Sequence, residues 1–379
     1  MTVKSFDPNP TTPTICLGMI VKDEAHVIER CLDSVRDSID CLFIDDTGST
    51  DQTVAVVSDW VHRNKVRGSI DRNVPWFNFG YNRSKVLRYI RLNEDMKQFN
   101  YTFMLDADET LQGDLKQALE QSYGRYGTYF DTYQIEVQLG DITYTRNFLF
   151  SNSKPFYFAG VIHEYAECDE PFNMSVLDGV RIISHHDGAR SLDPDKYQKD
   201  VKLFEQMAPD RDLTPREAFY FAQSLRDAGD IEKAIFWYNA RTNMEGYEEE
   251  EFYSHFMLGK LQDDGAHSYL TAFDMSPDRM EPLFWFGKDL MDKGMFHAAS
   301  IVLAPLEPDM ELPPGLFVET DVYVWRGAME RAVAAHYCKQ YALAVGLNQD
   351  LLDRNQLPPD ARVQVETNIA FSRQAYNND

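Results

Sequence analysis

The first half of the chain alternates short apolar runs with stretches in which apolar residues recur every three or four positions. Apolar runs of this length are typical of buried strands, and the recurring pattern is typical of helices that bury one face. The runs cover residues 14–21, 41–44 and 101–105, and the helical stretches cover residues 24–38, 53–62 and 81–92. Strands that alternate with helices predict an α/β fold, with a mostly parallel sheet flanked by helices.

Beyond Gly124 the pattern changes to alternation of apolar and polar residues. Residues 128–137 and 142–150 are rich in aromatic and β-branched side chains, and they predict a meander or hairpin added to the same sheet. Residues 181–184 form a last short apolar run, followed directly by His-His-Asp-Gly. We therefore expect the sheet to end close to residue 184.

After about residue 191 the strand pattern disappears and a spaced pattern of small residues takes its place. Gly229 is followed five positions later by Ala234, and Gly294 by Ala299. The two glycines are 65 positions apart, close to two repeats of about 34 residues, and residues 259–265 fit a degenerate copy between them. This spacing resembles that of tetratricopeptide repeats, with an ordinary helical bundle as the alternative. We expect an α/β domain over 1–195 and an all-α domain over 196–379.

The composition of the chain excludes some classes of function and indicates where in the cell the protein is expected. The chain has 61 acidic and 37 Lys or Arg side chains, a net charge of −24, which argues against a surface that attracts nucleic acid or anionic lipid as a whole. Its five cysteines are scattered without a Cys-x-x-Cys pair, so neither a disulfide framework nor a zinc site is indicated. The first 14 residues are polar, and no apolar run approaches the roughly 18 residues of a membrane span. We expect a cytoplasmic protein without a membrane span.

Polar and acidic clusters follow three of the expected strands. They occupy residues 22–24, 45–51 and 106–109. In an open α/β sheet the carboxyl ends of the strands form the ligand crevice, so these clusters are expected to converge. Asp106 and Asp108 would share a face if strand geometry continued through them, and such carboxylates suit a hard divalent cation bound to a diphosphate. The loops lack the glycine-rich cradle of a P-loop or a dinucleotide fold.

Taken together and in order, these segments resemble family 2 glycosyltransferases of the GT-A fold. The resemblance rests on MIVKDE, HVIERCLDSV, FIDDTGSTDQTV, WFNFGYNRSK and FMLDADE, followed by TRNFLF, YFAGVIHE and ISHHDG. It covers about residues 14–190, and the stretch from TRNFLF to YFAGVIHE resembles the acceptor-side segment of bacterial and phage-type members that end in tetratricopeptide repeats. Two departures are mild: Asp23 stands where Asn is commoner, and larger residues precede Arg83.

The resemblance implies a donor site for a nucleoside-diphosphate sugar, most simply a UDP-sugar. Glu24 and Asp46 would contact the nucleoside, Arg83 would face the donor phosphates, and Asp106 would lie near the ribose or the metal. The resemblance also implies two metal ligands on the donor side. They are Asp108 of the DxD motif and His186, with His185 as the alternative to His186. The implied cofactor is Mn²⁺ or Mg²⁺, which suit oxygen ligands joined by one imidazole.

The resemblance also implies a catalytic carboxylate on the acceptor side. Glu164 is the candidate general base, with Glu109 and Asp141 as rivals. In a strand, His163 and Glu164 would point to opposite faces, so His163 is equally a packed histidine. The aromatic run 156–158 is expected to line the core or the cleft, with an acceptor platform as the lesser alternative.

Each donor-site assignment has a structural alternative. Glu24 could cap the following helix, since an acid at a helix N-terminus is stabilising. Arg83 could be a solvated charge on a surface helix.

The function expected is a metal-dependent, inverting transfer of a sugar to a hydroxyl or thiol. The acceptor would be a peptide or protein, a glycan or a modified nucleic acid, and the helical half could hold a homodimer together. Two other classes remain: a scaffold protein with a disabled transferase domain, and a nucleotidyltransferase. Sugar release from a nucleotide-sugar panel separates them, since the scaffold releases none and a nucleotidyltransferase needs a nucleoside triphosphate.

Overall fold

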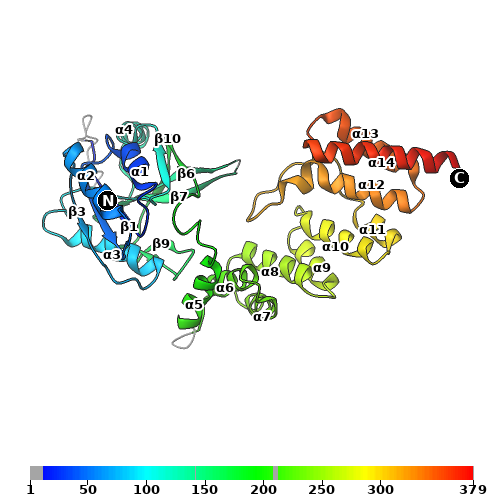
Figure 1. Cartoon of the computed structure of the whole chain (residues 1–379), viewed down its shortest axis with the longest axis horizontal. Helices are drawn as coiled ribbons and strands as arrows, with labels where there is room; N and C mark the ends of the chain where they lie inside the picture. Colours follow the sequence, from blue (N-terminus) through cyan, green and yellow to red (C-terminus); the bar gives the residue numbers. More distant parts are fainter. Residues whose placement is uncertain (1–11, 141, 208–211, 379) are drawn as a thin grey trace. The chain divides into compact units, whose positions relative to one another are not determined.

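The chain forms two compact units, Met1–Gln206 and Met207–Asp379 (Figure 1). The computed structural model describes residues 12–140, 142–207 and 212–378. The sequence pattern places the domain boundary between residues 195 and 196, before helix α5 (Lys196–Met207). The N-terminal unit includes nearly all of α5, because Arg190 Nη2 lies 2.8 Å from Asp200 Oδ2 and Phe204 is fully buried.

A large mixed sheet forms the centre of the N-terminal unit. Within the described residues it has eight strands in the order β3-β2-β1-β4-β7-β6-β10-β5. The strands are β1 (Ile15–Val21), β2 (Cys41–Asp46), β3 (Arg67–Asp71), β4 (Tyr101–Met104), β5 (Glu109–Gln112), β6 (Thr132–Leu139), β7 (Ile142–Ser151) and β10 (Met174–Ser184). Strands β2, β1 and β4 run parallel, as the sequence predicts, β3 joins them in parallel, and β6 also pairs parallel with β10. Strand β7 is antiparallel to both β4 and β6, which confirms the predicted hairpin.

Helices cover both faces of this sheet (Figure 1). Helices α1 (Ile28–Val35), α2 (Thr53–Asn64) and α4 (Leu115–Tyr126) contribute to the core on one face. Helix α3 (Phe79–Leu92) packs on the other face, together with β8 (Phe156–Ala159). Because β1 is buried on both faces, it reads as a continuous apolar run.

The structure contains several strands and helices that the sequence pattern does not predict. Strand β3 is short and mostly exposed, so its sequence RGSID lacks an apolar pattern. The hairpin of β8 and β9 (Tyr165–Cys168) forms a separate two-stranded sheet, and neither helix α4 nor the short strand β5 is predicted by the sequence pattern. Strand β4 ends at Met104, so the expected strand geometry through Asp106 and Asp108 is wrong.

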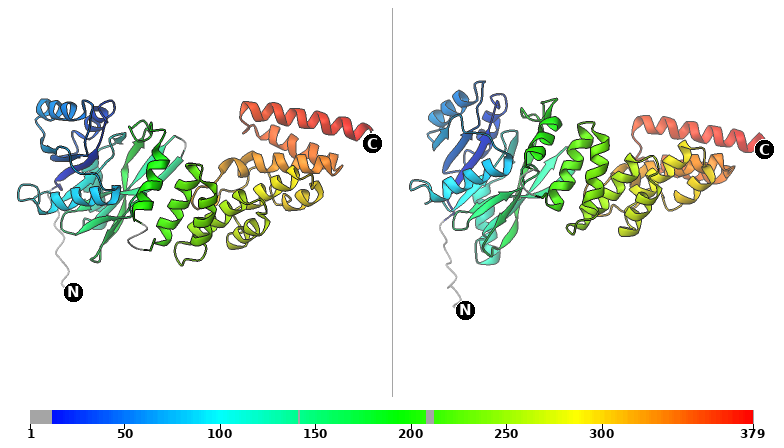
Figure 2. Two further views of the ribbon diagram at one scale, coloured as in Figure 1. Left: turned by 60° about the horizontal axis from the view of Figure 1, so that its bottom comes forward. Right: turned by 90° about the horizontal axis from the view of Figure 1, so that it is seen from below.

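The C-terminal unit is a row of helix hairpins, and Figure 2 shows these helices following one another along the unit. Its helices are α6 (Pro215–Asp227), α7 (Ile231–Arg241), α8 (Glu248–Leu261), α9 (Ala266–Met275), α10 (Glu281–Asp292), α11 (Phe296–Val302), the π-helical turn η1 (Val322–Arg326), α12 (Gly327–Tyr337), α13 (Tyr341–Arg354) and α14 (Pro359–Asn378). Gly229 and Gly294 take positive φ angles of 88° and 72° in the turns of the first and third hairpins. A Cβ on Gly265 would lie 2.0 Å from Gly259 O, so the degenerate copy also forms a tight hairpin. The predicted helical-repeat architecture is confirmed.

Among the residues that the structure describes, no helix combines the length and the apolar character needed to cross a bilayer.

Candidate active site

The loops that follow β1 and β2 are joined by a hydrogen-bond network around Asp23. The Asp23 backbone has a positive φ of 57°, which directs its side chain toward the second loop. Asp23 Oδ1 accepts hydrogen bonds from Thr50 N (2.6 Å) and Thr50 Oγ1 (3.1 Å), and Asp23 N donates to Ser49 Oγ (2.9 Å). The unusual Asp at this position therefore fixes one loop against the other.

The two aspartates at the end of β2 have different partners. Asp46 is buried, and its carboxylate accepts a hydrogen bond from Ser49 N at 3.1 Å. Asp45 is fully buried and pairs with Lys85 Nζ of α3 at 2.7 Å, while its Oδ1 has no hydrogen-bond partner in the structure. Asp46 thus orders the loop predicted to hold the nucleoside, and Asp45 ties that strand end to α3.

Glu24 reaches across to the segment after the last strand. Its Oε2 accepts a hydrogen bond from Ala189 N at 3.1 Å. Helix α1 begins at Ile28 without a side-chain cap, so the alternative that Glu24 caps this helix is wrong. Burial raises the pKa of Glu24 to about 7, the Ala189 N–H opposes this, and the negative charge of Asp108 adds to it. Glu24 and Asp108 are therefore close enough to repel one another.

Arg83 joins the DxD segment to the candidate base. Its Nη2 donates to Asp106 Oδ1 at 2.5 Å, and its Nε lies 2.6 Å from Glu164 Oε1. The Arg83 side chain is only 11% exposed, so the alternative of a solvated helix charge is wrong. Burial opposes ionisation of Asp106, but Arg83 and then Arg146 outweigh it and lower the pKa of Asp106.

Arg146 of β7 is a site residue that the sequence argument did not single out. Its Nη2 donates to both oxygens of Glu109, at 2.7 and 2.8 Å, and its Nη1 lies 3.8 Å from Asp106 Oδ2. Its guanidinium also lies over the Phe148 ring, 4.4 Å from the centroid. The sequence offered one indication of its role, namely a charged arginine within the alternating strand pattern of TRNFLF. The contacts of Arg146 could not be predicted from that pattern, because they depend on β7 lying beside β4.

Asp108 faces the His-His-Asp-Gly segment. Its Oδ2 accepts a hydrogen bond from Gly188 N at 3.4 Å, and a Cβ on Gly188 would lie 3.0 Å from the same oxygen. Burial and the charge of Asp106 raise the pKa of Asp108, while the Gly188 N–H and His186 oppose the rise. His185 Nε2 instead lies 2.9 Å from Thr110 Oγ1, so of the two histidines His186 is the one whose charge acts on Asp108.

The side chains around Asp108 are compatible with a divalent cation, but they do not complete its coordination sphere. Among residues 12–140, 142–207 and 212–378, no three His, Cys, Asp or Glu side chains are placed to hold a metal. Glu24 and Asp108 are partly buried carboxylates with raised pKa values, and the negative charge of Asp108 contributes to the rise at Glu24, which a cation between them would relieve. Asp108 and His186 can therefore supply part of a coordination sphere whose other oxygens come from a bound ligand or water.

Glu164 lies in a tight turn between β8 and β9 rather than in a strand. His163 takes a positive φ of 52° in this turn, so the argument from alternating strand faces does not apply. The turn packs against α3: Phe79 N donates to Val161 O at 3.1 Å, and a Cβ on Gly80 would lie 2.1 Å from Gly160 O. Of the rival bases, Glu109 is enclosed by Arg146 with a side chain only 3% exposed, and Asp141 lies outside the described residues.

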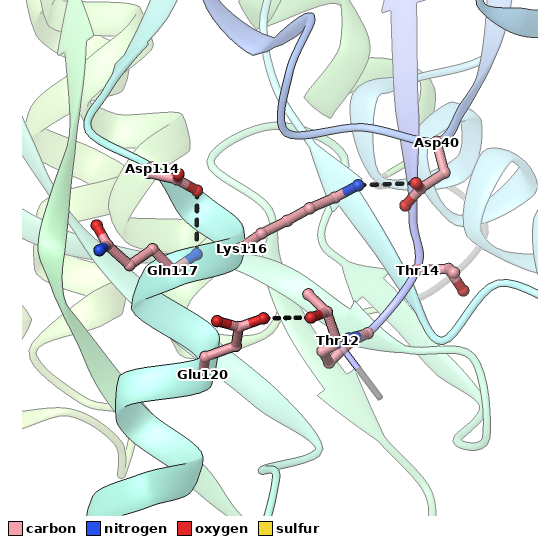
Figure 3. Close-up of a pocket in the computed structure, with 8 residues that line it drawn as sticks. Thr12, Thr14, Asp40, Asp114, Lys116, Gln117 and Glu120 are labelled. Atoms are coloured by element: carbon pink, nitrogen blue, oxygen red, sulfur yellow. Dashed lines mark hydrogen bonds and ion pairs between the residues drawn. The ribbon is translucent and has the colours of Figure 1, made fainter. Parts of the chain in front are cut away.

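A polar hollow lies beside the amino ends of β1 and β2 (Figure 3). It is lined by Thr14, Asp40 and Asp114, which precede β1, β2 and α4. Lys116 Nζ and Asp40 Oδ1 are 2.7 Å apart across it. None of the predicted site residues lines this hollow.

One family model and several known proteins are similar to this chain. Residues 16–174 match the family described as Glycosyl transferase family 2. The chain is 24% identical over 235 residues to the SPbeta prophage-derived glycosyltransferase SunS of Bacillus subtilis, covering 59% of this chain and 52% of the relative. It is 30% identical over 159 residues to a TPR repeat-containing protein of Synechococcus elongatus, covering 40% of this chain and 35% of that protein. The chain thus spans about half or less of these relatives.

Solved structures give weaker likenesses. The S. aureus TarS structure in complex with UDP aligns over 89% of this chain and 90% of that chain, with 9% identity and a TM-score of 0.34. A TPR repeat-containing protein from Cytophaga hutchinsonii aligns over 49% of this chain and 68% of that chain, with 17% identity and a TM-score of 0.40.

Proposed function

Because residues 16–174 belong to glycosyl transferase family 2, we propose that this protein transfers a sugar from a nucleoside-diphosphate sugar to a hydroxyl or thiol acceptor. One observation carries the proposal. The ends of β1 and β4, the start of α3 and the turn before β9 bring Glu24, Asp106, Asp108, Arg83 and Glu164 into one connected site. This is the sheet edge at which α/β folds bind nucleotides.

In this proposal the nucleoside lies against the loops joined by Asp23, with Asp46 and Glu24 on either side. A uridine base fits the proposal because a uracil N–H donates a hydrogen bond that a carboxylate can accept. Arg83 is already held by two carboxylates, so its part is to position Asp106 and Glu164 as well as to place positive charge near the diphosphate.

Asp108 and His186 are the residues that would hold Mn²⁺ or Mg²⁺. When bound, such an ion neutralises the charge that builds up on the departing diphosphate. Asp106 and Asp108 play separate parts here, since Asp106 is neutralised by arginines while Asp108 has a backbone N–H and a nearby histidine.

In this proposal the transfer is a single displacement with inversion at the anomeric carbon. The acceptor oxygen or sulfur forms a bond to the anomeric carbon, and the bond from that carbon to the diphosphate oxygen breaks, which releases the nucleoside diphosphate. The acceptor proton passes to a carboxylate, for which Glu164 is the candidate. Arg83 contacts Oε1, so Oε2 would take the proton.

Nucleotide binding tests this proposal before any acceptor is known. Calorimetric titration of the full chain with UDP, GDP, ADP and CMP in the presence of Mn²⁺ should show selective binding of one diphosphate, with UDP expected. The affinity should fall in Asp46→Asn and stay unchanged in the exposed control Asp178→Asn. Binding of none of the four nucleotides would contradict the proposal.

A further inference from the structure

The helix hairpins of the C-terminal unit follow a regular spacing that breaks after α11. Helices α6, α8 and α10 begin 33 positions apart, at Pro215, Glu248 and Glu281. Six and five residues join these hairpins to one another, whereas 19 residues, 303–321, lie between α11 and η1. Residues 307–319 of this long connection, here called the strap, turn back onto the preceding hairpins.

The main chain of the strap is held by two charged side chains. Leu316 N donates a hydrogen bond to Glu249 Oε2 of α8 at 3.0 Å, and Leu316 O accepts one from Arg279 Nη2 at 3.1 Å. A Cβ on Gly315 would lie 2.5 Å from both Arg279 Nη1 and Glu249 Oε2, and Gly315 has a φ of 138°. The surface under the strap therefore accepts a glycine turn at this point and excludes a side chain.

Two side chains of the strap contact the same surface. The Phe317 ring packs against the Tyr253 ring of α8, with centroids 4.8 Å apart. The Glu319 carboxylate accepts a hydrogen bond from Trp285 Nε1 at 2.9 Å and lies 3.4 Å from Lys260 Nζ. The surface thus fits an aromatic residue two positions before a carboxylate.

The charged groups of this surface also have partners outside the strap. Arg279 Nη2 lies 3.0 Å from Glu281 Oε1, and these two side chains are 2% and 0% exposed. The Tyr323 hydroxyl donates to Glu281 Oε2, and Lys260 Nζ lies over the Trp285 ring, 3.8 Å from its centroid. Departure of the strap would therefore leave no buried charge without a partner, which is the condition for the surface to persist without it.

The strap itself has little buried side-chain surface. Leu306 before it and Val322 after it are 0% exposed, but the structure describes every residue of the strap and none of them is buried. Phe317 is 47% exposed and has a positive φ of 53°, a strained backbone for an aromatic residue. Segments with few buried apolar contacts open most easily, so the strap is the weaker partner in this contact.

We propose that the strap is a built-in occupant of a peptide-binding surface formed by α8 and the start of α10. When the strap opens, this surface takes a polypeptide segment of another molecule with the pattern Gly-x-aromatic-x-acidic. The pattern repeats the three positions that the surface contacts, Gly315, Phe317 and Glu319. The strap competes with such a segment because it is tethered beside the surface. This inference is independent of the proposed transferase activity and gives the helical unit a binding function of its own.

Release of the strap tests the inference. A fluorescein-labelled peptide with the sequence of residues 311–321, ELPPGLFVETD, is titrated with the full chain, and its fluorescence anisotropy is measured. Gly315→Ala adds a Cβ that overlaps Arg279 and Glu249 and should release the strap. This variant should bind the peptide about tenfold more tightly than the wild type, because the tethered competitor is gone. Gly346→Ala is the matched control and should bind as the wild type does, since a Cβ there meets nothing within 4 Å.

Further substitutions locate the peptide on the proposed surface. In the Gly315→Ala chain, Lys260→Met should weaken binding about tenfold, because the peptide carboxylate loses its cation. Lys288→Met, which removes an ammonium paired with Glu330, should not weaken it. A peptide with both Phe317→Ala and Glu319→Gln should bind much more weakly than the original. Equal binding by the wild type and Gly315→Ala, equal binding of the two peptides, or no binding by any chain would overturn the inference.

Hydrogen exchange on the wild type tests the opening of the strap without any substitution, and it decides the matter if Gly315→Ala fails to fold. The amides of Leu316 and Glu319 donate to Glu249 and Glu281, so they exchange only when the strap leaves the surface. Their exchange should be much faster than that of the amides within α8 and α10. Protection of these two amides equal to that of α10 would overturn the inference.

Discussion

Arg83 Nε lies 2.6 Å from Glu164 Oε1, and the same guanidinium donates to Asp106 through Nη2. One side chain of α3 thus links the Asp106 carboxylate after β4 to the Glu164 carboxylate before β9. Neither carboxylate has this partner nearby in the sequence. The link explains how the turn between β8 and β9 holds the candidate general base, whose side chain is only 13% exposed, in a defined place.

Glu164→Gln tests the proton-accepting role. The amide keeps the shape of the side chain but cannot take the acceptor proton, so turnover should fall roughly 10²- to 10⁴-fold while donor affinity stays nearly unchanged. Steady-state kinetics and donor titration measure the two effects. Glu167→Gln, whose carboxylate accepts a hydrogen bond from Tyr157 at 2.8 Å, serves as the control. Near-normal turnover in Glu164→Gln would place the base elsewhere.

Arg83→Met should destabilise the N-terminal unit. It removes the guanidinium that contacts Glu164 and leaves Asp106 with only Arg146, 3.8 Å away, and breaking such a buried pair costs about 3–5 kcal/mol. Arg83→Lys should restore part of the stability but little activity, because an ammonium cannot span both carboxylates as the guanidinium does. Urea unfolding and turnover are compared with Arg88→Met, an exposed position on the same helix. Equal stability of the two methionine variants would contradict the bridging role.

Asp108→Asn tests the metal assignment. The substitution removes a charge but keeps the shape, so donor binding that depends on Mn²⁺ and turnover should both fall, and chelation should abolish wild-type transfer. Calorimetry with and without Mn²⁺ measures the first effect. Asp178→Asn, an exposed carboxylate paired with Arg125, is the matched control. Full activity of the wild type in excess chelator would rule out a metal-dependent reaction.

Glu24→Gln tests the electrostatic strain at the site. The pKa of Glu24 is raised to about 7, so the folded state binds a proton that the unfolded state releases above its ordinary pKa of about 4.5. Wild-type stability from this group therefore falls as pH rises from about 4.5 to 7. Glutamine keeps an acceptor for Ala189 N and lacks this loss, so Glu24→Gln should gain stability relative to wild type at pH 8 compared with pH 5. Parallel thermal melts at the two values measure it, and a constant difference would refute the argument.

The sequence predicts those parts of the fold that have a strong local pattern. Strands β1, β2 and β4 are buried on both faces and stand out as apolar runs, and the clusters after them lie where parallel strands end together. Strand β3 lacks such a pattern because most of its side chains are exposed. The tetratricopeptide-like hairpins are recognisable because their turns need glycine at fixed places, such as Gly229 and Gly294.

Pairings between distant segments could not be predicted in the same way. Arg146 reaches Glu109 and Asp106 only because β7 lies antiparallel next to β4. Glu24 meets Ala189 N because the chain after β10 returns to the end of β1. Such contacts depend on the order of the strands in the sheet and not on the spacing of residues along the chain. The sequence motifs therefore point to candidate site residues but do not show which residues they contact.

Cleavage of a nucleotide sugar is the most direct test of the proposed activity. The full chain is incubated with Mn²⁺ and a panel of UDP-, GDP-, ADP- and CMP-linked sugars, and released nucleotide is measured for the wild type, Asp108→Asn and Asp178→Asn. The account predicts release from one nucleotide class, with UDP-sugars expected, and a large loss in Asp108→Asn alone. No release from any donor, or equal release by Asp108→Asn and the wild type, would contradict it.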